Sequence, residues 1–159
     1  MTNKLNSMRV LEANKVAYNI FTYDEEIHDA VQVAAVIGIP VNQVYKTLVV
    51  ERSAGRKPVL VMIAADKQLD LKKLAASVGE KKVSMASHAD AERLTGLKVG
   101  GIGALALIQK NWSVYLDQPV EKLSHICVSA GQRGTNLRVP VADLVRVLKA
   151  KIVQASSAD

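Results

Sequence analysis

The sequence VYKTLVV at 44–50 is followed, after the turn SAGR at 53–56, by the apolar run PVLVMIA at 58–64. Both runs are rich in β-branched residues, and the short turn between them predicts an antiparallel hairpin. Because the first run is apolar on both faces, we expect this strand to be buried within a sheet. Lys46 is the charged exception, so its ammonium must find a partner or face a cleft. The alternative is a lysine on an edge strand whose side chain reaches water.

Helices and strands are expected on both sides of this hairpin. Helical patterns cover 4–14, 29–37 and 71–78, a short helix begins after Ser87, and a last helix opens at Pro140 with an apolar stripe that runs to Ile152. Further strands are expected at 16–23, 112–116, 123–128 and, after the turn at 131–134, up to Val139. The predicted N-caps are Asp70 and Ser87, and the predicted helix ends are Gly38, Gly79 and Gly96.

This order of elements predicts the fold class. Helices and strands are interspersed, yet some strands pair through short turns. A mixed α/β (α+β) fold, with helices packed on a mixed β-sheet, therefore fits better than a purely parallel sheet. We expect a single domain over residues 1–153 and a loose C-terminal tail over 154–159.

The composition limits the classes of function. The 159 residues include 21 Lys and Arg against 15 Asp and Glu, a net charge of +6, and 49% of them are hydrophobic. This apolar content suffices for one buried core, and it excludes the possibility that the chain as a whole is a disordered tail. The positive charge favours an acidic partner, of which nucleic acid is the commonest, although it also serves solubility. Aromatic residues make up only 4%, which argues against a surface that stacks successive bases.

The expected setting is cytoplasmic. No apolar run approaches the ~20 residues of a membrane span, and the first residues contain no apolar stretch typical of a signal peptide. A single cysteine excludes an internal disulfide and a cysteine-based zinc site, and the three histidines have no metal-ligand spacing. We therefore expect no metal, no other cofactor and no membrane partner.

Two glycine-containing segments are candidates for a site built from backbone groups. Gly100-Gly101-Ile102-Gly103 can present N–H groups to a phosphate or an oxyanion. A plain tight turn is the alternative, and from Gly101 the loop also matches the dinucleotide pattern G-x-G-x-x-A, although no full helix is expected after it. Ser129-Ala130-Gly131 ends a predicted strand and can donate in the same way, or can be an ordinary turn.

Cys127 and His125 lie two residues apart on one predicted strand. Their side chains point in parallel from the same face, which is poor geometry for a nucleophile and its base. We expect Cys127 to pack in the core, as lone cysteines in apolar strands usually do.

Three segments at these spacings resemble one family: VYKTL at 44–48, VGGI at 99–102 and VSAGQRG at 128–134. The likeness is strengthened by DLKK at 70–73, Gly79, KKV at 81–83 and the closing Asp143-Leu144 helix. The chain resembles the YbaK/EbsC family of aminoacyl-tRNA deacylases, which are similar to the editing domain inserted in bacterial prolyl-tRNA synthetases. The likeness covers nearly the whole chain. It implies a mixed β-sheet that is curled towards a barrel and flanked by helices.

The resemblance also implies a function, trans-editing, in which the ester between a wrong amino acid and its tRNA is cleaved. The implied substrate is cysteinyl-tRNA(Pro) or a similar small amino acid on tRNA, and prolyl-tRNA synthetase is a candidate partner. Matching positions assign catalytic roles to Lys46, Gly100, Gly101, Ser129 and Ala130, and substrate-binding roles to Tyr23, Thr47, Ile102, Gly131 and Asn136. The chain departs from the family pattern at Ala104-Leu105-Ala106, where a Pro followed by Gly is common, and at Asn136, where an Asp is common. These departures affect the amino-acid specificity more than the reaction class.

The residues themselves suit this chemistry, because an aminoacyl ester is already activated and needs no strong base. Backbone N–H groups of Gly100, Gly101 or Ala130 can hold the developing oxyanion. Lys46 can position the terminal ribose or phosphate, or offset negative charge in the transition state. Water attacks the ester or, in a cysteinyl substrate, the substrate's own thiol does. Phosphate contacts are expected among the surface cations Arg52, Arg56, Lys57, Lys72, Lys73, Lys81 and Lys82, each of which can also be simply solvated.

Two other functions stay open from the sequence. One is a non-catalytic module of the same fold that binds tRNA or a synthetase. The other, based on the glycine pattern alone, is a nucleotide-cofactor protein. Deacylation assays on a panel of mischarged tRNAs distinguish all three.

Overall fold

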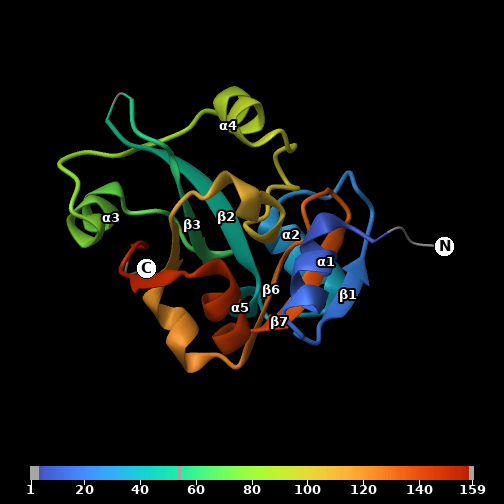
Figure 1. Cartoon of the computed structure of the whole chain (residues 1–159). Coiled ribbons are helices and arrows are strands. Elements are labelled where there is room, and N and C mark those ends of the chain that lie inside the picture. The colour runs from blue at the N-terminus through green and yellow to red at the C-terminus, as the bar shows by residue number, and fades with distance from the viewer. Residues whose placement is uncertain (1–3, 54, 158–159) are drawn as a thin grey trace.

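The computed structural model describes residues 4–53 and 55–157, which form two β-sheets with helices packed around them (Figure 1). The larger sheet has five strands in the order β4-β2-β3-β5-β8, and the smaller sheet has three in the order β1-β7-β6. The mixed α/β fold predicted from the sequence is confirmed.

The predicted hairpin forms the centre of the larger sheet. β2 (Tyr45–Glu51) and β3 (Val59–Ala64) are antiparallel. β5 (Val114–Asp117) lies parallel to β3, and β8 (Lys151–Val153) lies parallel to β5. β4 (Ser84–Met85) pairs with β2 only at Val50 and Glu51. The edge of β2 around Lys46 therefore has no strand from β4 beside it, and a cleft can open there.

The smaller sheet pairs a strand from near the N-terminus with two strands from the C-terminal half of the chain. β1 (Asn19–Thr22) and β6 (His125–Ser129) both pair antiparallel with β7 (Thr135–Pro140). A single parallel bridge between Val44 and Cys127 connects this sheet to the start of β2. The two sheets thus meet at one corner, and the barrel-like curl stays a prediction.

The helices begin and end close to where the sequence predicts. They are α1 (Asn6–Ala13), α2 (Ala30–Ile37), α3 (Leu71–Val78), α4 (His88–Thr95) and α5 (Val141–Leu148), with short 3-10 helices η1 (Val41–Gln43), η2 (Leu105–Lys110) and η3 (Gln118–Lys122). The Asp70 carboxylate accepts the Lys73 N–H at 3.0 Å, and the Ser87 hydroxyl accepts the Asp90 N–H at 3.1 Å. Both predicted N-caps are confirmed, as are the helix ends at Gly38, Gly79 and Gly96.

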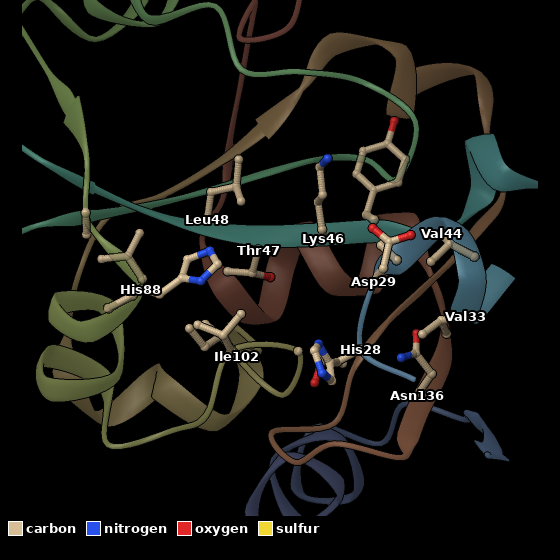
Figure 2. Close-up of a pocket in the computed structure, with 18 of the residues that line it drawn as sticks. His28, Asp29, Val33, Val44, Lys46, Thr47, Leu48, His88, Ile102 and Asn136 are labelled. Atoms are coloured by element: carbon tan, nitrogen blue, oxygen red, sulfur yellow. The ribbon is translucent and has the colours of Figure 1, made fainter. Parts of the chain in front are cut away.

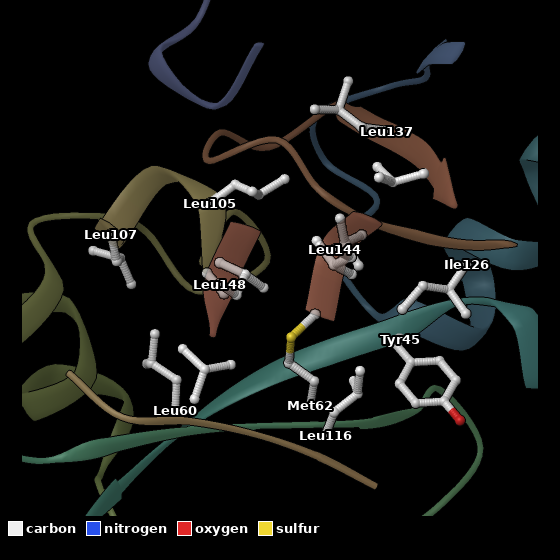
Figure 3. Packing of buried hydrophobic residues seen from close by; sticks show 14 of the residues in the cluster. Tyr45, Leu60, Met62, Leu105, Leu107, Leu116, Ile126, Leu137, Leu144 and Leu148 are labelled. Carbon is white, nitrogen blue, oxygen red and sulfur yellow. The ribbon is translucent and has the colours of Figure 1, made fainter. Parts of the chain in front are cut away.

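Apolar side chains cover both faces of the larger sheet. Figure 3 shows Leu60, Met62 and Leu116 of the sheet against Leu144 and Leu148 of α5. On the other face, the alternate residues of β3 pack with Leu74 of α3. Every residue of β3 is at most 5% exposed. This explains why the hairpin sequence is apolar at consecutive positions rather than at alternate ones.

Two predicted boundaries are wrong, and one strand was not predicted. The last helix ends at Leu148 because Lys149 adopts a left-handed conformation (φ +53°), and Ile152 belongs to β8 instead of the helical stripe. The first strand shortens from 16–23 to β1, since only those four residues find partners on β7. β4 has just two residues, too few for a periodic signal, and the sequence analysis missed it.

The expected loose tail is also wrong for residues 154–157, whereas 158 and 159 lie outside the described residues. Ala155 is fully buried, and its N–H donates to the Asp117 carboxylate at 2.9 Å. The Ser156 hydroxyl donates to the other oxygen of Asp117 at 2.5 Å, and the Ala155 carbonyl accepts the Asp70 N–H. A buried carboxylate needs such donors, so Asp117 fastens the end of the chain to β5 and α3. None of the helices in the described part of the chain has the length and apolar character that a membrane span requires.

Replacing Asp117 should test this anchor. Asp117→Ala leaves two donors without their acceptor, so we expect the free energy of unfolding to fall by about 2–3 kcal/mol in urea denaturation. Asp143→Ala is the matched control, because it removes an exposed carboxylate that pairs with Arg146 at 3.1 Å. The control should cost clearly less. Equal losses for the two variants would contradict an anchoring role for Asp117.

Candidate active site

A cleft of about 370 Å³ opens beside β2, where β4 has ended (Figure 2). Its walls come from β2, the start of α2, α4, the glycine loop and β7. Seven of the ten residues predicted for the site line it: Tyr23, Lys46, Thr47, Gly100, Ile102, Ser129 and Asn136. The other three, Gly101, Ala130 and Gly131, do not line the cleft.

Lys46 places a cation in a mostly apolar setting. It is partly buried on β2, and its Nζ donates to the carbonyl of Ala65 at 3.2 Å. Burial lowers the pKa of Lys46, and the nearby carboxylates of Asp29 and Asp66 oppose this by raising it. No carboxylate of the described residues forms an ion pair with Lys46. The remaining N–H donors of this ammonium are thus available to a ligand.

Three residues that line the cleft each have a buried polar side-chain atom without a hydrogen-bond partner among the described residues. These atoms are the hydroxyl oxygen of Tyr45, Oγ1 of Thr47 and Oδ1 of Asn136. The amide nitrogen of Asn136 donates to the Tyr23 hydroxyl at 3.0 Å. Burial raises the pKa of Tyr23, so the phenol keeps its proton and can donate it onward. Orphaned polar atoms are rare in protein interiors, so their presence in a cleft points to a bound polar ligand.

The glycine loop lies against the turn at 129–134, and all three of its glycines are required by close contact. A Cβ on Gly103 would collide with the carbonyl oxygen of Ser129. Gly100 has a φ of +90°, and a Cβ there would collide with the side chain of His28. A Cβ on Gly101 would lie 2.7 Å from the backbone nitrogen of Arg133. The loop is therefore held by backbone packing, and Gly100 faces the cleft.

Two of the three proposed oxyanion donors are wrong. The N–H of Gly101 donates to the Lys98 carbonyl at 2.8 Å, and the N–H of Ala130 donates to the Thr135 carbonyl at 3.0 Å. Both groups are already committed to the backbone. The N–H of Gly100 has no such partner in the described part of the chain. Gly100 is thus the member of this set that can still donate to a ligand.

The small-residue turn has a largely structural role. Ser129 lines the cleft, and its hydroxyl accepts the Gly131 N–H at 3.2 Å. Ala130 is buried, and its carbonyl accepts the Ser7 hydroxyl of α1 at 2.5 Å. These contacts fix the turn that supports the glycine loop.

The sequence analysis missed three polar residues of the cleft. His28 and His88 both line the cleft, and Asp29 lies beside Lys46 (Figure 2). No motif could have identified them, because His28 and Asp29 come from the start of α2 and His88 comes from the start of α4, far away in the sequence. The described residues contain no group of three or more His, Cys, Asp or Glu side chains that could hold a metal ion.

Cys127 lies outside the cleft, as expected. It is 1% exposed, and its neighbours in the core are Ala34, Val44 and Ala65. Burial raises the pKa of the thiol to about 11. His125 has its Nδ1 3.0 Å from the hydroxyl of the adjacent Ser124. The cysteine is therefore neither ionised at neutral pH nor placed to attack a ligand.

Comparison with known proteins gives consistent matches along the chain. The family model for the aminoacyl-tRNA editing domain matches residues 24–147. The putative Cys-tRNA(Pro)/Cys-tRNA(Cys) deacylase EbsC of Enterococcus faecalis is 38% identical over 140 residues, which cover 86% of this chain and 83% of EbsC. The multifunctional Ser/Thr-tRNA deacylase ProXp-y of Escherichia coli K12 is 30% identical over 132 residues, which cover 79% of each protein.

The structural matches agree in fold. The crystal structure of a putative trans-editing enzyme for prolyl tRNA synthetase superposes with a TM-score of 0.83 at 20% identity, over 99% of this chain and 100% of that one. A crystal structure titled as a hypothetical protein gives a TM-score of 0.86 at 22% identity, over 96% and 99% of the two chains. At these identities the likeness establishes the fold.

The pH dependence of stability should report the buried charge of Lys46. Because its pKa lies below the ordinary 10.5, the unfolded chain binds more protons at this position between the two values. The free energy of unfolding of wild type should therefore rise with pH between these two pKa values, and Lys46→Met should lack this rise. In urea denaturation, we expect the free energy of unfolding of Lys46→Met minus that of wild type to be largest near neutral pH and to shrink towards pH 10.5. A difference that does not change with pH would mean that the lysine is not desolvated.

Cys127 should prove to be a packing residue. Cys127→Ala removes a buried sulfur, so we expect a loss of about 1 kcal/mol in the free energy of unfolding. Ligand turnover at the cleft should be unchanged, and a thiol reagent should label native wild type slowly because the thiol is buried and protonated. A stable Cys127→Ser variant without activity would overturn this interpretation.

Proposed function

Because the chain belongs to the aminoacyl-tRNA editing domain family, we propose that it is a trans-editing deacylase that hydrolyses the ester of a mischarged aminoacyl-tRNA. The observation that carries the proposal is the cleft itself. It combines a partly buried ammonium, a free backbone N–H at Gly100 and unpaired polar atoms within apolar walls. Such a site can bind and polarise an ester without a side-chain nucleophile.

The size of the cleft supports a small amino acid. Its volume is about 370 Å³, and it must hold the aminoacyl group together with part of the terminal ribose. Val33, Val44, Leu48 and Ile102 narrow it with apolar side chains. We infer cysteinyl-tRNA(Pro), or another small aminoacyl group on tRNA, as the substrate, in line with the names of the two deacylase relatives.

The reaction follows from charge development at the ester carbonyl. As a nucleophile attacks, the carbonyl oxygen becomes negative, and the Gly100 N–H can hold it at that stage. The Lys46 ammonium offsets the same charge or holds the ribose oxygens of the leaving tRNA. The nucleophile is water or, for a cysteinyl group, the substrate's own thiol. Catalysis then depends on geometry and electrostatics more than on a strong base.

The polar atoms opposite Lys46 suit the amino end of the substrate. Oδ1 of Asn136 is an acceptor without a donor, and an α-ammonium group supplies donors. The Tyr23 hydroxyl fixes the Asn136 amide so that this oxygen remains free. Thr47 adds a hydroxyl that can donate or accept. These contacts would orient the ester between Gly100 and Lys46.

The partners follow from the same proposal. The substrate is a mischarged tRNA, and we propose prolyl-tRNA synthetase as a protein partner that hands it over. The net charge of +6 favours association with the anionic tRNA.

A deacylation panel with two site variants tests the function. Wild type should hydrolyse at least one of Cys-, Ser-, Thr- or Ala-tRNA(Pro). Gly100→Ala introduces a Cβ against His28 at a positive φ and displaces the oxyanion donor, so kcat should fall by about 10²-fold or more. Lys46→Met should also lower kcat, while both variants keep most of their affinity for tRNA.

The matched control is Gly79→Ala. Gly79 also has a positive φ, but a Cβ there meets open space at the end of α3, outside the cleft. It should lose stability and keep its turnover. If wild type binds tRNA and hydrolyses none of the panel, the chain is a non-catalytic binding module and the proposed function is wrong.

A further inference from the structure

A second groove adjoins the cleft and shares one wall with it. It has a volume of about 670 Å³ and is lined chiefly by polar residues, among them Glu25, Glu26, Lys98 and Arg133. His28 lines both the groove and the cleft. In the view of Figure 2, His28 lies between Ile102 and Asn136. A ligand that leaves the cleft past His28 therefore enters this groove.

Arg133 is fixed at the boundary between the two. Its Nε donates to the carbonyl of Val99 at 2.7 Å, and Val99 itself lines the cleft. The backbone of Arg133 lies against Gly101, where no Cβ fits. Its two terminal nitrogens have no partner among the described residues. The guanidinium is thus held in place with its outer edge free, which suits recognition of a phosphate.

Lys98 adds a second cation to the groove. It is exposed and forms no ion pair with a described residue. By contrast, Arg52 and Arg56, which the sequence analysis favoured for phosphate contacts, both pair with the Glu80 carboxylate. Cations that are already compensated attract a phosphate less strongly. Lys98 and Arg133 thus line the adjoining groove without an ion pair to any described residue.

The two carboxylates of the groove indicate a ligand that carries hydrogen-bond donors in addition to a phosphate. Glu25 and Glu26 are exposed and would repel a bare anion. Carboxylates accept hydrogen bonds from exocyclic amino groups, of which the N4 amine of cytosine is the usual partner in nucleic acids. A groove with both kinds of group suits a nucleotide: phosphate on the cations and base edge on the carboxylates.

We propose that this groove binds the single-stranded 3′ end of the tRNA as it leaves the cleft. Lys98 and Arg133 bind the phosphodiester on the 5′ side of the terminal adenosine, and Glu25 and Glu26 accept from the amino group of the cytosine that precedes it. The proposal rests on the deacylase function, because it places the aminoacyl ester in the adjoining cleft. It excludes a path over the part of the cleft that is lined by Met85 and His88.

Two substrates separate phosphate binding from catalysis. One is the aminoacyl-tRNA that wild type hydrolyses best, and the other is the same amino acid esterified to adenosine without a 5′ phosphate. Lys98→Ala should raise KM for the tRNA by up to about fivefold and leave KM for the adenosine ester and kcat unchanged. The slope of log K against log[salt] for tRNA binding should fall in magnitude by about 0.7, the value for one phosphate of a single strand.

Lys122→Ala is the matched control, since Lys122 is an equally exposed lysine that lines neither the cleft nor the groove. It should change neither KM nor the salt slope. Lys82→Ala tests the alternative path, because Lys82 is one of the surface cations expected to contact phosphate and lies outside the groove. If Lys98→Ala behaves like Lys122→Ala, or if Lys82→Ala has the larger effect, the groove is not the path of the tRNA. An equal rise in KM for both substrates would also overturn the proposal, because it would show a general defect of the cleft.

The carboxylates have their own test. The double variant Glu25→Ala with Glu26→Ala should raise KM for a tRNA that ends in CCA. It should have no effect when the cytidine before the terminal adenosine is changed to uridine, which lacks the amino group. An equal effect on both tRNAs would contradict base recognition.

Failure of the groove and failure of the deacylase function give different results. If wild type hydrolyses the panel and the Lys98 variant matches its control, the function stands and the groove is wrong. If wild type hydrolyses nothing, but the slope of log K against log[salt] for tRNA binding is still smaller in Lys98→Ala, the groove stands as a tRNA site and the catalytic function is wrong.

Discussion

Strand β3 is buried on both faces, and this requires an apolar layer on each side of the larger sheet. Its hairpin partner β2 extends past the end of β4, so one edge of β2 is left without a strand from β4. That edge is where the cleft opens. A charge can be tolerated at this edge because Lys46 is only partly buried, whereas every residue of β3 is buried. Lys46 therefore lies where the apolar core borders the cleft.

Backbone hydrogen bonding then limits what the site can contain. Three glycines in the loop let it pack against the turn at 129–134. Within the loop, the Gly101 N–H bonds to Lys98, and within the turn, the Ala130 N–H bonds to Thr135. Gly100 lines the cleft, and its N–H has no backbone partner among the described residues. The loop is thus a scaffold that leaves the Gly100 N–H available to a ligand. Arg133 contributes to that scaffold by its bond to Val99 and to the adjoining groove by its outer edge.

The sequence predicts those parts of the fold that depend on local patterns. The hairpin, the N-caps at Asp70 and Ser87 and the alternation of helices and strands follow from periodicity and turn chemistry, and all are observed. The anchored end of the chain depends instead on the distant carboxylate of Asp117, and β4 depends on pairing with two residues of β2. In the site, Lys46 is conspicuous as a charge in an apolar strand. His28 and His88 are far apart in the sequence, and only the fold places both of them in the cleft. Whether a given N–H is free depends on partners that no local sequence pattern reveals.

Asp29 shows how one residue can connect the fold to the charge of the site. Its carboxylate caps α2 by accepting the Gln32 N–H at 3.3 Å, and it also lines the cleft and raises the pKa of Lys46 against the effect of burial. The two side chains form no ion pair, so Asp29 stabilises the ammonium through space without occupying its donors. A direct ion pair would have neutralised Lys46 and blocked its approach to a substrate. At its present separation, the carboxylate favours the charged lysine and leaves it free to bind. Asn136, where the family commonly has an aspartate, is consistent with this balance, because a second anion in the cleft would compete with the substrate for the same cation.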